Sequence, residues 1–129
     1  MSIEVSQRYN LIDIHDSRIQ RIVIDVSAKT CILELHGAAV LKDSSRSFDY
    51  EVIYEPARLI FRDVHEIKFP EGYCLNGLIV SDEITATENI DFFQFSLSTT
   101  GGWDNDTFMR TIEIVARDFS LTGEVVAPA

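Results

Sequence analysis

A histidine followed by an aspartate, His15 and Asp16, is the first pair in the chain whose residue types could do chemistry. Such a pair can hold a divalent metal ion for phosphoester hydrolysis, but that chemistry needs further His and Asp ligands presented by a helical bundle. Here the pair stands between LIDI and IQRIVI, whose composition and alternation are typical of strands. Because short oxygen-bearing side chains satisfy backbone amides in turns, we interpret His15-Asp16 as the junction of two strands.

The three histidines of the chain, His15, His36 and His65, are far apart in the sequence. A metal site built on a strand would show two histidines one residue apart, and that spacing does not occur. We therefore predict three unrelated histidines, with no metal site and no cofactor.

Nucleophilic catalysis has no signature in the sequence. The chain has no G-x-S-x-G elbow, no S-x-x-K motif, no cysteine-centred motif and no phosphate-binding glycine loop. The run TTGGWDND offers the oxygens of Asp104, Asn105 and Asp106 to calcium, but it lacks the glycine and the distal glutamate of an EF-hand loop. We predict a hairpin tip there and no enzymatic activity. Trp103 beside the tip is either a hydrophobic lid or an interface anchor.

Two cysteines, Cys31 and Cys74, bear on the cellular compartment. Cys31 lies in an apolar alternating run, so we predict a buried, reduced thiol. The first residues, MSIEVSQRYN, show no basic leader followed by an apolar run, and no stretch is apolar for long enough to cross a bilayer. We expect a cytoplasmic protein.

The formal net charge is −10, and it is unevenly distributed. Residues 65–129 carry three basic against eleven acidic side chains, and no Lys or Arg occurs between Phe69 and Met109. Such a surface repels nucleic acid and anionic membranes and attracts basic partners. The acidic half is either a solvated face or a face that binds a partner. Its acidic residues in the stretch free of Lys and Arg are Glu71, Asp82, Glu83, Glu88, Asp91, Asp104 and Asp106.

The dominant period of the sequence is two, which indicates strands. Residues 22–26 and 31–35 alternate on either side of the short connection SAK, which predicts a β-hairpin. Residues 48–54 alternate as a half-buried strand, and Pro56 then marks an edge, a bulge or a break. A short helix starting at Pro56 is the main alternative, but we favour a strand. A parity change in residues 59–69 predicts a bulge near Asp63.

The second half of the chain begins with a weak pattern and then becomes regular. Residues 70–89 contain turn residues and a segment, IVSDEITATEN, that fits either an irregular strand or a connection. Residues 93–97 alternate, TTGGWDND supplies turn residues, and residues 108–121 resume strand character, which predicts a second hairpin. Parity changes near Arg117 and Asp118, so the last strand should bulge or cross between sheet faces there. The ending VVAPA resembles a frayed tail.

These elements predict the fold class. We find no linker and no internal repeat, so residues 1–129 should form a single β-rich domain. Several short strands joined mostly as hairpins predict an all-β fold, or β with one short helix. Its architecture would be an antiparallel β-sandwich or an open barrel built from hairpins.

Four segments follow one another in the chain: HDSRI, LIFRDVHEI, FFQFSLSTTGGWDND and IEIVARDFSL. With two alternating strands after the first, this order resembles the small bacterial β-rich domains that are grouped with polymorphic-toxin immunity proteins and related families of unknown function. The resemblance covers most of the chain, and these families offer no catalytic residues to transfer. It implies a protein that silences a toxin by binding it tightly.

Charge and resemblance together favour a non-enzymatic acidic module that binds a basic protein partner, since an acidic face gives rapid, oriented association with a basic one. The alternatives are a small-ligand-binding β-domain and a self-associating one, for example a homodimer through an exposed edge strand. The residues we predict to meet the partner are Asp82, Glu83, Glu88, Asp91, Trp103, Asp104 and Asp106.

Overall fold

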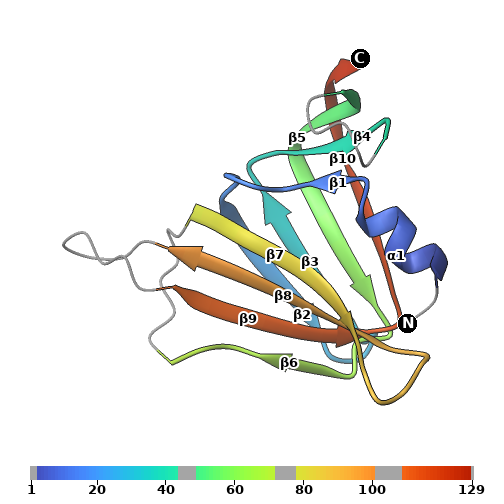
Figure 1. The fold of residues 1–129 in the computed structure, drawn as a ribbon. Coiled ribbons are helices and arrows are strands. Elements are labelled where there is room, and N and C mark those ends of the chain that lie inside the picture. Colours follow the sequence, from blue (N-terminus) through green and yellow to red (C-terminus); the bar gives the residue numbers. More distant parts are fainter. Residues whose placement is uncertain (1–2, 44–48, 72–77, 101–108, 129) are drawn as a thin grey trace.

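The computed structural model describes residues 3–43, 49–71, 78–100 and 109–128 (Figure 1). The described strands form two open antiparallel sheets, with one short helix beside them, which confirms the predicted all-β class. That helix has neither the length nor the apolar character that crossing a membrane requires. The elements are α1 (Ile3–Tyr9), β1 (Ile12–Asp13), β2 (Ile19–Asp25), β3 (Thr30–Leu35), β4 (Ala38–Leu41), β5 (Tyr50–Arg62), β6 (Glu66–Lys68), β7 (Leu78–Ala86), β8 (Phe93–Thr100), β9 (Arg110–Ala116) and β10 (Asp118–Pro128).

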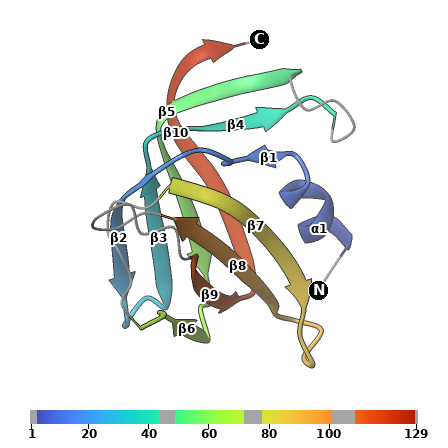
Figure 2. The ribbon, with the colours of Figure 1, turned by 60° about the vertical axis from the view of Figure 1, so that its left-hand side comes forward.

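The first sheet has the order β1-β4-β5-β3-β2, with β10 paired to the other side of β5. The long strand β5 bends near its middle (Figure 2), and it pairs first with β4, at Tyr54 opposite Ala38, and then with β3, at Ala57 opposite Leu35. Pro56 lies between these two pairings, so its missing N–H leaves no ladder bond unmade. The predicted strand through Pro56 is confirmed, and the alternative of a helix starting there is wrong.

The predicted fraying of the ending VVAPA is wrong. Strand β10 continues to Pro128, with Ala127 opposite Ile53 and Pro128 opposite Val52. The first half of β5 offers this segment a row of backbone partners, and backbone pairing does not need an alternating side-chain pattern. The tail is therefore held by a strand that lies more than sixty positions earlier in the chain.

The second sheet has the order β6-β9-β8-β7. Phe93, Phe95 and Leu97 of β8 are buried, as their alternation predicts. Strands β8 and β9 pair as the second predicted hairpin, whose tip falls in residues 101–108, outside the described residues. Strand β7 resolves the open choice for IVSDEITATEN, because it is a strand with an irregular register between Ile79 and Ser81.

The chain passes from one sheet to the other at two described places. At Arg117, β9 of the second sheet ends and β10 of the first begins, which confirms the predicted crossing. Near Asp63 the predicted bulge is wrong: β5 ends at Arg62, and β6 belongs to the other sheet. Asp63 adopts a positive φ of 51°, a turn conformation that Asp accepts more readily than most residues. The parity change therefore marks a change of sheet.

The core lies between the two sheets. Cys31 is fully buried, as predicted, and burial raises the pKa of its thiol from 9.0 to about 11. Helix α1 closes one side of the sandwich, where the Tyr9 ring packs edge-on against Phe95 and Phe119 at centroid distances of 5.9 and 5.8 Å. Other fully buried side chains are Leu33, Leu35, Leu59, Ile79, Leu97 and Ile114.

The opposite side of the sandwich lies between the edge strands β2 and β6 (Figure 2). Ile24 of β2 stands opposite the buried Cys31, so both side chains belong to the inner face. Yet Ile24 is 46% exposed and Val26, just beyond the strand, is 84% exposed. The predicted hairpin is confirmed, but its apolar face extends past the cover of the short strand β6. A homodimer through such an edge strand stays a prediction.

Candidate functional site

A hollow of about 230 Å³, which we call the acidic hollow, lies where β1, β4 and the first half of β5 meet the turn after β1. Three of its lining residues, Asp13, Asp16 and Glu55, are carboxylates, and no lysine or arginine of the described residues lines it. The hollow is therefore a place of concentrated negative charge. Its other lining residues are His15, Ser17, His36, Gly37, Ala38, Ala39, Tyr50 and Ile53.

The turn at His15-Asp16 builds one wall, and the prediction that these residues join two strands is confirmed. Asp13 Oδ1 accepts a hydrogen bond from the backbone N–H of His15 at 3.1 Å. Asp16 has a φ of 64°, and its backbone N–H donates to the carbonyl oxygen of Ile79 at 3.0 Å. This hydrogen bond connects the turn to β7 of the second sheet, so it holds this wall of the acidic hollow in place.

The other wall comes from β4 and β5. The Tyr50 hydroxyl donates to Asp13 Oδ2 at 3.2 Å, and the backbone N–H of Gly37 donates to Ser17 Oγ at 3.2 Å. A Cβ added to Gly37 would lie 3.1 Å from Glu55 Cγ, so the carboxylate-bearing side chain of Glu55 packs closely here. The wall therefore contributes an aromatic hydroxyl and a carboxylate.

Asp82 connects the acidic hollow to the helix. It is half-buried and faces inward from β7, opposite the buried Leu97, and its carboxylate accepts a hydrogen bond from the Tyr9 hydroxyl. Burial raises the pKa of the Asp82 carboxyl, the Tyr9 hydroxyl lowers it, and the nearby Asp13 and His15 raise and lower it respectively. Burial raises the pKa of Tyr9 far above its ordinary value, and the charge of Asp82 adds to that shift.

The sequence-predicted partner residues are only partly brought together. Asp82 and Glu83 are neighbours on β7 and close to Tyr9, and Asp82 is also close to Asp13 and His15 of the acidic hollow. Glu88 and Asp91 are exposed in the connection from β7 to β8, beyond the far end of β7. Trp103, Asp104 and Asp106 lie outside the described residues.

Most of the acidic hollow could not be predicted from the sequence. The prediction that the three histidines form no shared metal site stays a prediction, although His15 and His36 line this hollow together. Strand pairing brings them near each other, since Asp13 of β1 stands opposite Ala39 of β4, and Ala39 opposite Ile53 of β5. No local sequence pattern indicates that such distant segments pair. Among the described residues, no three His, Cys, Asp or Glu side chains form a metal-binding group.

No protein family, curated protein or solved structure matches this chain. The resemblance to immunity proteins therefore stays a prediction.

The pair of Asp82 and Tyr9 gives a first testable expectation. Because the pKa of Asp82 is raised from 3.8 in the folded chain, the folded state binds its proton more tightly than the unfolded state does. The free energy of unfolding then falls as pH rises above about 4. We expect Asp82→Asn to remove this fall and to be more stable than the native chain at pH 7, since a neutral amide costs less to bury and its oxygen still accepts the Tyr9 hydroxyl.

Urea unfolding of both chains at pH 4 and at pH 7 measures this effect. Glu83→Gln is the matched control, because Glu83 is the exposed neighbour on the same strand and loses the same charge. An Asp82→Asn chain whose stability tracks the native chain at both pH values would contradict the expectation.

Proposed function

We propose that the protein is a non-enzymatic binding module that holds a basic protein partner at the acidic hollow. The observation that carries the proposal is the lining itself, in which Asp13, Asp16 and Glu55 converge without a lysine or arginine of the described residues among them. Groups of this kind are neutralised best by a guanidinium or an ammonium group. The partner would supply that group from an arginine or a lysine.

The size and chemistry of the acidic hollow suit one long basic side chain. Its volume of about 230 Å³ is below the range of about 300–1,000 Å³ that is usual for small-molecule pockets. The Tyr50 ring lines the same space as Asp13, and an aromatic ring next to a carboxylate attracts a cation by two mechanisms.

The charge of the rest of the chain supports association with a basic partner. With a net charge of −10, the protein attracts cationic surfaces from a distance, and this raises association rates at low salt. Asp82 adds a carboxylate close to Asp13 and His15 of the acidic hollow, while Glu88 and Asp91 add only to the long-range charge from the connection after β7. We propose that the partner is a basic toxin that the module neutralises in the cytoplasm, as the resemblance implies.

Catalysis by His15 and Asp16 is the competing interpretation, because His15 Nδ1 and Asp16 Oδ2 lie 3.1 Å apart. The side chains are 59% and 68% exposed, so water competes for both partners of the pair. A catalytic pair is normally oriented by a third group and shielded from water. Binding therefore agrees better with the surroundings of the two side chains.

The test compares two variants that lose the same number of charges. The first, Asp13→Asn with Asp16→Asn and Glu55→Gln, neutralises the acidic hollow, and asparagine tolerates the positive φ of residue 16. The second neutralises three exposed carboxylates elsewhere: Glu88→Gln, Asp91→Asn and Glu124→Gln. The probe is a fluorescent nona-arginine peptide, whose binding is followed by fluorescence anisotropy at low and at high salt.

We expect the first variant to bind the peptide at least about tenfold more weakly than the second, because charge-assisted hydrogen bonds of about 1.5–3 kcal/mol are lost only at the acidic hollow. The difference should persist at high salt, where long-range attraction is screened. Equal losses in the two variants would mean that net charge alone attracts the peptide, and the proposed function would be wrong.

A further inference from the structure

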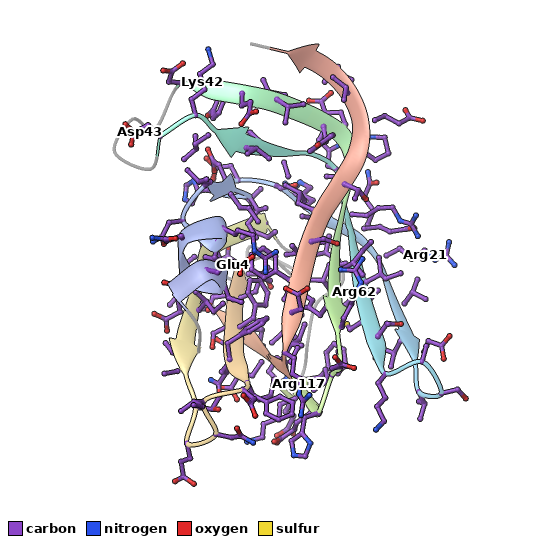
Figure 3. All side chains as sticks on the ribbon, turned by 90° about the vertical axis from the view of Figure 1, so that its right-hand side faces the viewer. Glu4, Arg21, Lys42, Asp43, Arg62 and Arg117 are labelled. Carbon is purple, nitrogen blue, oxygen red and sulfur yellow. The ribbon has the colours of Figure 1, made fainter. Side chains whose placement is uncertain are left out.

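A second hollow lies at the opposite end of the molecule from Lys42, where Arg117 is found (Figure 3). We call it the basic hollow; its volume is about 240 Å³. It forms where the chain changes sheets, at the tip of the β2–β3 hairpin and the segments before β6 and β10. Its lining residues are Lys29, Asp63, Val64, His65, Phe92 and Arg117.

Backbone bonds fix the segments that carry these side chains. The N–H of Val64 donates to the carbonyl oxygen of Lys29 at 2.9 Å, and the N–H of His65 donates to that of Val115 at 2.8 Å. The N–H of Arg117 donates to the carbonyl oxygen of Arg62 at 3.2 Å. The basic hollow is thus built from several strand ends that are tied to one another.

The Phe92 ring helps to hold two of the polar side chains. The guanidinium carbon of Arg117 lies 5.0 Å from the Phe92 ring centroid, over its face, and the His65 ring centroid lies 5.5 Å from it. A guanidinium stacked on a ring keeps its N–H groups, which lie in its plane, available for an anion. Arg117 is therefore positioned before any ligand binds.

The basic side chains of the basic hollow, Lys29 and Arg117, differ from several others in the chain in whether they form ion pairs. Arg8, Lys42 and Lys68 each form an ion pair with a carboxylate. Lys29 and Arg117 form no ion pair with any described residue, although the chain carries a net charge of −10. The basic hollow is lined by two basic side chains, Lys29 and Arg117, and by one carboxylate, that of Asp63. It is a positive spot in an acidic protein.

An apolar groove of about 430 Å³ adjoins the basic hollow, and the two share Lys29, Val64 and His65 as lining residues. The groove lies between the edge strands β2 and β6, on the side of the sandwich away from α1. Its volume is within the usual range for small-molecule pockets. Its apolar lining residues are Ile24, Val26, Val64, Ile67 and Phe69.

The carboxylates that also line the apolar groove are already engaged. Asp25 Oδ1 accepts a hydrogen bond from the N–H of Ala28 at 3.0 Å, within the hairpin turn. Glu66 pairs with Lys68 at 3.4 Å. Among the residues that line the basic hollow itself, Lys29 and Arg117 are thus opposed by the carboxylate of Asp63.

We propose that the basic hollow and the apolar groove together bind a small amphiphile that has an anionic head group and a single apolar chain. The head group would contact Lys29 and Arg117, and the chain would cover the inner-face side chains of β2 that β6 leaves open, among them Ile24. Charge complementarity at one end and apolar surface along the rest select this class over a purely inorganic anion or a neutral hydrocarbon. This site is separate from the acidic hollow, so either proposal can fail without the other.

The experiment follows amide signals of the ¹⁵N-labelled full chain by NMR during titration with octanoate. Acetate, which has the head group without the chain, and 1-octanol, which has the chain without the charge, are the comparison probes. We expect saturable shifts of Val64, His65 and Arg117 with octanoate. Acetate and 1-octanol should each bind at least about tenfold more weakly than octanoate, because each lacks either the apolar chain or the charged head group. Absence of saturable shifts at these residues with octanoate would overturn the proposal, as would shifts that depend on protein concentration alone, which would assign the groove to a second copy.

Two variants sharpen the test. Lys29→Gln with Arg117→Gln should weaken octanoate binding about tenfold and leave 1-octanol binding unchanged, whereas the control Lys42→Gln with Arg58→Gln removes the same charge elsewhere and should change neither. Asp63→Asn should tighten octanoate binding, and asparagine tolerates the φ of 51° at this position, so this gain does not depend on a damaged fold. Equal effects of the two double variants, or weaker binding by Asp63→Asn, would contradict the proposal.

Discussion

Replacing Phe95 by alanine is expected to lower the free energy of unfolding by about 3–5 kcal/mol, a large part of the total stability of a domain of this size. Phe95 is fully buried at the centre of the sandwich. Its ring lies 4.8 Å from that of Phe61 in the first sheet and 5.9 Å from that of Tyr9 in α1. Alanine would therefore leave a cavity at the point where both sheets and the helix meet.

Urea unfolding monitored by circular dichroism measures this loss. The control is Val26→Ala, which removes an apolar side chain that is 84% exposed and should change stability by less than about 0.5 kcal/mol. A Phe95→Ala loss as small as that of the control would show that the two sheets do not pack through this residue.

Gly123→Ala is expected to destabilise the chain by about 1–3 kcal/mol, although alanine in a strand is ordinarily more favourable than glycine. A Cβ at Gly123 would lie 2.4 Å from the carbonyl oxygen of Pro56 and 2.8 Å from Tyr54 Cβ. These atoms belong to β5, against which β10 pairs with a shifted register after Gly123. To relieve this steric overlap, the two strands would have to separate, and backbone hydrogen bonds between them would be lost.

Gly37→Ala is the matched control, because a Cβ there would meet the flexible side chain of Glu55 at 3.1 Å and the carbonyl oxygen of Tyr54 at 3.2 Å. We expect a smaller loss, measured by thermal unfolding of both variants. Equal stabilities of Gly123→Ala and the native chain would contradict the close approach of β10 to Pro56.

Local patterns in the sequence were sufficient where a strand has one buried face. The alternation of Phe93, Phe95 and Leu97 predicts the inner face of β8 because successive strand residues point to opposite sides of a sheet. The parity change at Arg117 predicts the crossing between sheets for the same reason. Helix α1 is not predicted by the sequence pattern, since the one short helix considered there would start at Pro56. Helix α1 is too short to be stable alone and depends on the packing of Tyr9.

The other features of the fold and of the candidate site depend on pairing between segments that are far apart in the chain, which local sequence patterns do not show. The ending VVAPA has no alternation, and it is held by β5 through backbone groups that any sequence carries. The acidic hollow is similar, since its carboxylates come from two segments that are far apart in the chain, residues 13–16 and Glu55. The net charge of the sequence instead favours the second half as the binding region, because the acidic excess is larger there. Composition shows that charge is present, while only strand pairing decides which charges meet.

The central claim is that a basic partner is held at the acidic hollow, and chemical-shift mapping with the nona-arginine peptide tests it most directly. We expect saturable shifts of the backbone signals of His15, Asp16 and Gly37, which persist when salt is raised, and smaller shifts at Glu88 and Asp91 that disappear with salt. Shifts spread evenly over the acidic residues, or lost altogether at high salt, would contradict the claim.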